Sequence, residues 1–166
     1  MTASIESAFG SRVMANGFLL NNELTDFSFR PEVDGRPVAN RVEAGKRPRS
    51  SMSPTLVLDR EGRFVMAIGS PGGSRIIGYT AKAVIAALDW QLSLQDAVAL
   101  PNFVNRNGAT DLEAGTAIVD AQAALEALGH EVRVIEMTSG LHGIRRTAAG
   151  LQGGADPRRE GVVLQE

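Results

Sequence analysis

The stretch from Phe64 to Tyr79, FVMAIGSPGGSRIIGY, restricts the fold of this chain more than any other. An apolar run enters a Ser-Pro-Gly-Gly-Ser turn, and a helical pattern follows. Adjacent Gly72 and Gly73 allow consecutive backbone N–H groups to point the same way with no side chain in front of them. Because a helix start adds partial positive charge, the turn can hold an anion or the oxyanion of an acyl transfer. The alternative is a sharp turn that binds nothing; the stretch matches neither a P-loop nor G-x-G-x-x-G.

A hairpin and a helix flank this turn. Residues 55–58 and 64–68 predict two strands joined by a turn, and both are nearly all apolar, so we expect them to be buried on both faces. The helix should run to about Trp90, and its spacing predicts an apolar face made of five residues: Ile77, Ala81, Val84, Ile85 and Leu88.

Further elements follow from alternation and capping signals. Alternation predicts a first strand over Thr2–Ala8. Ser93 has capping-box spacing and predicts a short second helix. A third helix should begin with Asp120 as its cap and end at Gly129, followed by a strand over 131–137. Because strands and helices do not alternate regularly, we predict an α+β fold with a mixed or antiparallel sheet covered by helices.

Composition bounds the function classes. The 166 residues suit a single domain, 1–166, with a real core. The net charge of −2 gives no basic excess, so we expect no nucleic-acid partner. No run is long enough for a membrane span, and the start lacks the pattern of a signal peptide. Without cysteine and with only His130 and His142, we expect no metal site and no cofactor.

Three groups of polar residues are candidates for binding. Adjacent Ser50 and Ser51 offer two hydroxyls to a carboxylate, or are ordinary turn serines. Glu23 and Asp26 share a face on any helical segment and can hold an ammonium group, or are solvated carboxylates. Glu6 has the same two interpretations. The segment Arg30–Ser50, with three prolines and two glycines, predicts a long exposed loop.

Four motifs carry a family resemblance. FLLNNELTDFS, KRPRSSMSPT, GSPGGSRII and GGADPRREG occur in the order and spacing of the small subunit of gamma-glutamyltransferases (gamma-glutamyltranspeptidases), which this chain resembles over nearly its whole length. The resemblance implies the αββα sandwich of the N-terminal-nucleophile hydrolases. It also implies an enzyme that passes a gamma-glutamyl group, for example from glutathione, to water or to an amino-acid or peptide acceptor.

The resemblance assigns roles residue by residue. The glycine pair corresponds to the oxyanion hole, and residues 30–49 correspond to a lid over the site, short and lacking the aromatic gate of some members. Ser4 corresponds to a hydroxyl position beside the nucleophile. In this correspondence, the substrate's alpha-amino group faces Glu6, Glu23 and Asp26, and its alpha-carboxylate is bound by Ser50 and Ser51.

The match fails at the chain start. The family's small subunit opens with a Thr-Thr-His-type motif whose first Thr is the nucleophile, and these 166 residues do not contain it. Thr2 corresponds to a later strand, and Met1 looks like a start introduced by truncation. We therefore expect the chain alone to be inactive, to lack the first strand and the large subunit of its precursor, and to self-associate through uncovered apolar surface. Family members in bacteria are commonly periplasmic or secreted.

Two alternatives stay open from the sequence. One is a relative with the same scaffold and another acyl substrate, such as a cephalosporin acylase or a poly-gamma-glutamate transferase. The other is a non-catalytic module that binds an amino acid or an anion.

Overall fold

The computed structural model describes residues 3–6 and 10–164, which fall into two compact units, 1–50 and 51–166. The expectation of one domain over 1–166 therefore stays a prediction.

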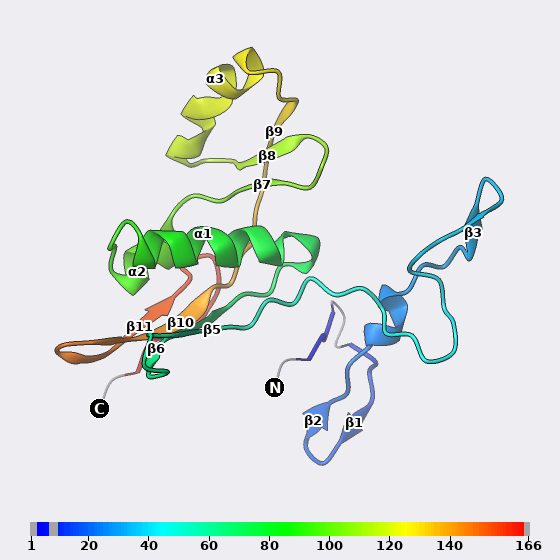
Figure 1. Cartoon of the computed structure of the whole chain (residues 1–166), viewed down its shortest axis with the longest axis horizontal. Helices are drawn as coiled ribbons and strands as arrows, with labels where there is room; N and C mark the ends of the chain where they lie inside the picture. The colour runs from blue at the N-terminus through cyan, green and yellow to red at the C-terminus, as the bar shows by residue number, and fades with distance from the viewer. Residues whose placement is uncertain (1–2, 7–9, 165–166) are drawn as a thin grey trace. The chain divides into compact units, whose positions relative to one another are not determined.

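The second unit is built on a four-stranded antiparallel sheet in the order β11-β10-β6-β5 (Figure 1). Its strands are β5 (Thr55–Leu58), β6 (Phe64–Gly69), β10 (His142–Thr147) and β11 (Gly150–Ala155). The predicted hairpin is confirmed by the pairing of β5 with β6. The expected mixed or antiparallel sheet is also confirmed.

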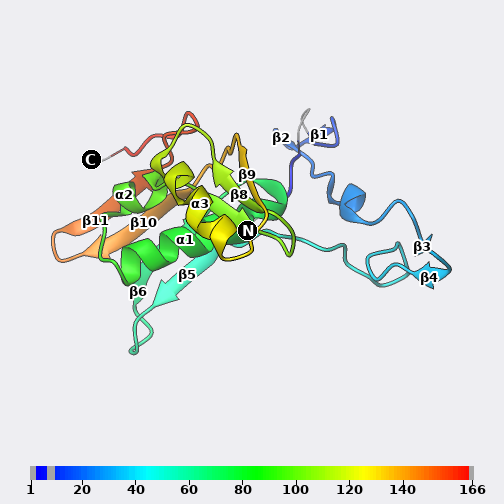
Figure 2. The same ribbon diagram turned by 90° about the horizontal axis from the view of Figure 1, so that it is seen from above.

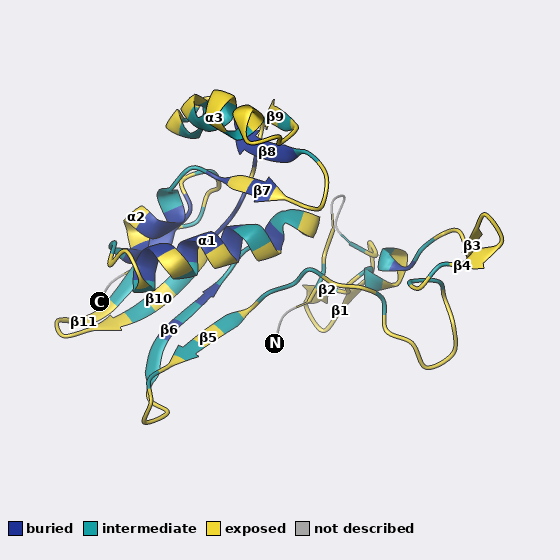
Figure 3. Ribbon diagram, turned by 45° about the horizontal axis from the view of Figure 1, so that its top comes forward, coloured by how far each residue is buried: buried dark blue, intermediate teal, exposed yellow. Residues whose placement is uncertain are grey.

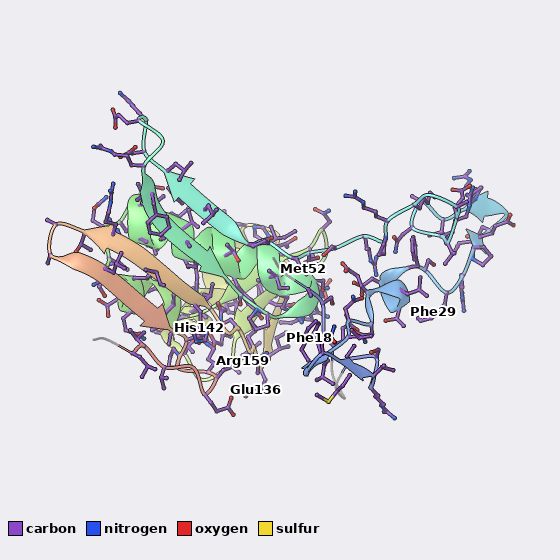
Figure 4. All side chains as sticks on the ribbon, turned by 90° about the horizontal axis from the view of Figure 1, so that it is seen from below. Phe18, Phe29, Met52, Glu136, His142 and Arg159 are labelled. Atoms are coloured by element: carbon purple, nitrogen blue, oxygen red, sulfur yellow. The ribbon has the colours of Figure 1, made fainter. Side chains whose placement is uncertain are left out.

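The prediction that both hairpin strands are buried on both faces is wrong for β5. This strand lies at the sheet edge, where Leu56 is 72% and Leu58 is 56% exposed. Helices cover only one face of the sheet, and Figure 4 shows the other face from below with no helix of the described second unit in front of it. The apolar sequence of β5 therefore did not indicate a strand that is buried on both faces of the sheet.

Two helices, α1 (Ile76–Leu88) and α2 (Leu94–Ala99), pack on the covered face and lie side by side across it (Figure 2). Ser93 accepts a hydrogen bond from the Asp96 N–H at 3.1 Å, which confirms the predicted capping of α2. Figure 3 shows that burial concentrates on β6, on the inner sides of these helices and on the strand β8 defined below. The core that they form includes Met66, Leu94, Val98 and Leu141.

The predicted apolar face of α1 is confirmed for Val84 and Leu88, which pack against the core, and is wrong for its other members. Ile77 is 57% and Ile85 is 44% exposed, whereas the buried side carries Ile76, Tyr79 and a row of alanines. The helix is apolar on most of its circumference, so spacing alone could not select the inner side. The small alanine side chains let the helix approach the sheet closely, and this packing determines the orientation.

A second, three-stranded sheet lies beyond α1 in Figure 1. It contains β7 (Phe103–Asn105), β8 (Thr110–Glu113) and β9 (Val132–Ile135), with β7 antiparallel and β9 parallel to the central β8. A 3₁₀ helix, η3 (Ala117–Ala121), continues into α3 (Gln122–Ala127). The predicted cap of the third helix is wrong, because Asp120 lies inside η3. Its predicted end is confirmed by Gly129, whose φ is 90°.

The first unit contains short elements: β1 (Met14–Ala15), β2 (Phe18–Leu19), η1 (Glu23–Asp26), β3 (Glu32–Val33) and β4 (Arg36–Pro37). Of the strand predicted over Thr2–Ala8, only residues 3–6 are described, and they form no strand. Thr2 itself lies outside the described residues. The predicted loop over Arg30–Ser50 is mostly exposed and includes the β3–β4 hairpin, which turns at Asp34 and Gly35 with φ of 52° and 71°.

Within residues 3–6 and 10–164, no helix is long and apolar enough to cross a membrane. The same residues hold no group of three or more His, Asp or Glu side chains arranged around a metal position.

Candidate functional site

The turn after β6 has a backbone that requires glycine. Gly72 has φ 137° and ψ 16°, and Gly73 has φ 58°, so both lie in the region that L side chains rarely adopt. A 3₁₀ helix, η2 (Gly73–Arg75), follows at once and leads into α1. The sequence prediction of a strand, a glycine turn and a helix is confirmed here.

The two glycines have different surroundings. A Cβ on Gly72 would lie 2.6 Å from Cε2 of Tyr79, a ring that is only 2% exposed. A Cβ on Gly73 would meet no atom within 4 Å. Gly72 is therefore required by both conformation and space, whereas Gly73 borders open space.

The backbone N–H groups of these glycines are available to a ligand. Among the described residues, neither the Gly72 nor the Gly73 N–H donates a hydrogen bond within the protein. Together with the helix that follows, two such groups make a site for negative charge.

A segment before β10 supports the turn. The Gly140 N–H donates to Ser70 Oγ at 3.2 Å. A Cβ on Gly140 would lie 2.7 Å from Cγ of Pro71 and 2.5 Å from Cδ of Arg159. Arg159 (labelled in Figure 4) donates to the carbonyls of Thr138 and Ser139, so it holds the segment that carries Gly140.

Buried residues of the GGADPRREG motif contact the same segment before β10. Asp156 is fully buried and accepts from Ser139 Oγ at 2.6 Å and from the Leu141 N–H at 3.1 Å. Burial alone would raise the pKa of Asp156, but these bonds and those from Arg158 outweigh it and hold the pKa below its ordinary value. Arg158 also pairs with Glu113 on β8. The motif is one of the four that carry the family resemblance, but the sequence alone indicated no role for its side chains.

A second buried carboxylate lies on the other side of the turn. Arg75, at the end of η2, donates to Asp111 Oδ2 at 2.8 Å, and Arg133 donates to Oδ1 at 2.6 Å. Asp111 is 1% exposed on β8, where it stands directly opposite Arg133. Arg106 donates to Ser74 Oγ at 2.5 Å. The turn and the start of α1 are thus bound to the three-stranded sheet by arginines.

His142 also has a partner, which the sequence did not indicate. It lies on β10 opposite Gly69, and its Nδ1 is 3.1 Å from the Gly140 carbonyl oxygen. Since a carbonyl can only accept, Nδ1 is the donor. Figure 4 labels this residue on the uncovered side of the sheet.

In the first unit, the two spaced carboxylates are the first and last residues of η1. Glu23 and Asp26 are both half-buried there, and residues three apart superpose along a 3₁₀ helix. The Glu23 N–H donates to Asn21 Oδ1 at 3.1 Å. Phe27, which follows η1, is 7% exposed and anchors it.

Glu6 lies beside the same 3₁₀ helix. Its N–H donates to Asn22 Oδ1 at 3.1 Å, and the Asn22 N–H donates to the Ser4 carbonyl at 3.4 Å. The charge of Asp26 raises the pKa of Glu6, with smaller contributions from burial and from a hydrogen bond between the two carboxyl groups. A cation between them would relieve this repulsion, so the pair suits an ammonium group.

The other predicted residues are divided between the units. Ser4 is half-buried and its carbonyl is bonded to Asn22, whereas Ser50 is exposed and ends the first unit. Ser51 begins the second unit, and its carbonyl accepts from Ser53 Oγ at 3.0 Å. The structure therefore brings Glu6 and Asp26 together, and separately forms the glycine turn.

This fold, with its glycine turn ahead of a helix, belongs to the class of N-terminal-nucleophile hydrolases. The gamma-glutamyltranspeptidase family model matches residues 1–166, and the chain belongs to that family. It is 35% identical over 167 residues to the glutathione hydrolase proenzyme of Escherichia coli K12, covering 95% of this chain and 29% of that protein. The chain thus spans less than a third of this curated relative.

Solved structures agree in fold. The gamma-glutamyltranspeptidase from Pseudomonas nitroreducens complexed with L-DON superposes with a TM-score of 0.79 at 31% identity, covering 100% of this chain and 92% of that chain. The cephalosporin acylase from Bacillus halodurans superposes with a TM-score of 0.72 at 25% identity, covering 89% and 27%.

Proposed function

We propose that this chain is the part of a gamma-glutamyl transferase or hydrolase that binds the gamma-glutamyl group and stabilises the reaction's oxyanion. One observation carries the proposal: the two free N–H groups of the glycine turn at the start of η2 and α1. The names of the relatives support gamma-glutamyl transfer from glutathione and related amides as the chemistry.

In the proposed reaction, a hydroxyl oxygen attacks the carbonyl carbon of a gamma-glutamyl amide, and the carbonyl oxygen takes the negative charge. The N–H groups of Gly72 and Gly73 donate to that oxygen. Collapse of the intermediate breaks the C–N bond, and the amine leaves with the proton that the hydroxyl gave up. Water or the amino group of an acceptor then attacks the resulting ester.

The nucleophile in this scheme is the N-terminal Thr of the family, which is not among these 166 residues. We therefore propose that the chain alone does not turn over substrate. Ser4 is proposed to lie beside the nucleophile as a second hydroxyl. No cofactor or metal enters the scheme.

The substrate's head group carries an ammonium and a carboxylate. We assign the ammonium to Glu6, Glu23 and Asp26, which supply negative charge from one small region of the first unit. We assign the carboxylate to the hydroxyls of Ser50 and Ser51. Residues 30–49 are proposed to act as the lid.

The large subunit of the same precursor is the proposed partner. The face of the four-stranded sheet that the helices leave uncovered presents exposed apolar side chains, among them Leu56, Leu58, Ile144 and Leu151. A second sheet packed here would bury them, as in an αββα sandwich. The same exposed face leads us to propose that the isolated chain self-associates, which light scattering would test against a monomer.

Similarity to a cephalosporin acylase favours one alternative, an acylase with another substrate. The carboxylate pair of Glu6 and Asp26 argues against it, because an acyl group without an ammonium gains nothing from two anions. A binding module without chemistry is the other alternative.

The experiment compares two proteins: the 166-residue chain, and the full precursor that we propose contains it. Each is assayed with gamma-glutamyl anilide and with glutaryl anilide, which lacks the alpha-amino group. We expect only the precursor to act, and to prefer the gamma-glutamyl compound. Equal rates on both anilides would favour the acylase. Glutamate binding without turnover by either protein would favour the binding module.

A further inference from the structure

Asn40 lies in the lid segment, three residues after the end of β4, and both the nitrogen and the oxygen of its side-chain amide form hydrogen bonds. Its Nδ2 donates to the Asp26 carbonyl oxygen at 2.7 Å. Its Oδ1 accepts from the Arg49 N–H at 2.8 Å. The Asn40 backbone carbonyl accepts a third bond, from the Ser28 N–H at 2.8 Å.

These bonds join two segments that are far apart in the sequence. Asp26 ends η1, and Arg49 directly precedes Ser50. The half-buried side-chain amide of Asn40 therefore links the 3₁₀ helix that ends at Asp26 to the loop segment that carries Ser50. These residues all belong to the first unit.

This link matters because of the substrate's geometry. In a gamma-glutamyl group, the ammonium and the alpha-carboxylate are attached to the same carbon, so their separation is fixed. A site that binds both must hold its two sets of partners at a matching distance before the substrate arrives. Asn40 connects the backbone of Asp26, a member of one set, with the backbone of Arg49, the residue next to Ser50.

We propose that Asn40 is a positioning residue, which sets the spacing between the ammonium-binding turn and the carboxylate-binding serine. The inference rests on the proposed function. It adds a residue that touches no substrate atom and that acts through Asp26 and Ser50.

The test is competitive inhibition of the full precursor by three ligands. L-glutamate offers both groups at the head, glutarate lacks the ammonium, and 4-aminobutyrate lacks the alpha-carboxylate. Removing a spacer should weaken a two-point ligand more than a one-point ligand. We expect Asn40→Ala to raise the inhibition constant of L-glutamate about tenfold, and those of the other two less than about threefold.

A second variant and a matched control sharpen the test. Asn40→Ser keeps a shorter hydroxyl that can form one of the two bonds, so its effect should be intermediate, and it serves if the alanine variant does not fold. Asn105 in the second unit is the control, because its amide also bonds on both sides, to the Gly108 carbonyl at 2.9 Å and from the Asn107 N–H at 2.8 Å. Asn105→Ala should leave all three constants unchanged.

The outcomes separate the two proposals. Equal weakening of all three ligands by Asn40→Ala, or no weakening of L-glutamate, would overturn the positioning role while leaving gamma-glutamyl turnover by the unmodified precursor intact. A precursor that neither turns over gamma-glutamyl anilide nor binds L-glutamate would overturn the proposed function, and the role of Asn40 with it.

Discussion

Replacing Gly72 with alanine should destabilise the second unit much more than replacing Gly73. Alanine at φ 137° costs about 1–3 kcal/mol in backbone strain. The new Cβ would also lie 2.6 Å from the Tyr79 ring, and such overpacking adds about 1–3 kcal/mol. At Gly73, φ is 58° and nothing lies within 4 Å, so the cost is only the roughly 1–2 kcal/mol of a left-handed alanine.

Urea unfolding of the 166-residue chain, followed by the fluorescence of its single tryptophan, Trp90, measures both costs. A double-mutant cycle separates strain from contact. In a Tyr79→Leu background the cost of Gly72→Ala should fall by about 1 kcal/mol or more, because the ring is gone. In a Tyr79→Phe background it should not change, because the ring remains.

Two results would refute this reasoning. Equal costs for the two alanine variants would mean that the turn relaxes away from the Tyr79 ring. An unchanged cost of Gly72→Ala in the Tyr79→Leu background would mean that the ring is not the obstacle.

Two further predictions concern buried charges. Burial, assisted by Arg158, lowers the pKa of Lys82 to about 8 from 10.5, so between these values the unfolded chain holds a proton that the folded chain has lost. The free energy of unfolding should therefore rise as the pH increases from about 8 to about 10, by an amount on the order of 2–3 kcal/mol; urea titrations should show this rise in Lys46→Met but not in Lys82→Met. Asp111→Asn should cost about 2–4 kcal/mol of unfolding free energy, because it leaves two arginines without their shared anion. Asp59 also pairs with two arginines but lies in an exposed hairpin turn, so Asp59→Asn should change the free energy of unfolding little. If Asp59→Asn cost as much as Asp111→Asn, burial would not be the reason for the large cost at Asp111.

The local features of the second unit were predictable. The hairpin, the glycine turn, the cap at Ser93 and the end at Gly129 depend on backbone preferences of a few adjacent residues. The buried side of α1 was only partly predictable, because the exposed Ile77 and Ile85 fit the same period as the buried Ile76 and Tyr79. Only packing against the sheet distinguishes the two sides.

Around the candidate site, the glycine turn was predictable from the sequence and the side chains that support it were not. The turn at Gly72 and Gly73 was predicted from their adjacency, whereas the ligand-binding role expected of Glu6 and Asp26 stays a prediction. The support of the turn by Asp111 and Asp156 was not foreseen, because each carboxylate is 30 or more residues from Arg75 or the turn that it supports. The signal available was the arginine-rich ADPRR motif, since buried arginines need buried anions.

The charged groups of the two units have different surroundings. The difference agrees with the proposal that the glycine turn stabilises the oxyanion and that the first unit binds the substrate's ammonium group. Around the turn, the carboxylates of Asp111 and Asp156 are buried and paired, so we expect the N–H groups of Gly72 and Gly73 to be held in place. Fixed donors are what transition-state stabilisation requires. In the first unit, the carboxylates of Glu6 and Asp26 repel each other and lie near solvent. Such a pair gains from a cation that is present in the ground state. Substitutions that remove the support of the turn, such as Asp111→Asn, should therefore lower kcat of the precursor. Substitutions beside Asp26, such as Asn40→Ala, should mainly raise KM.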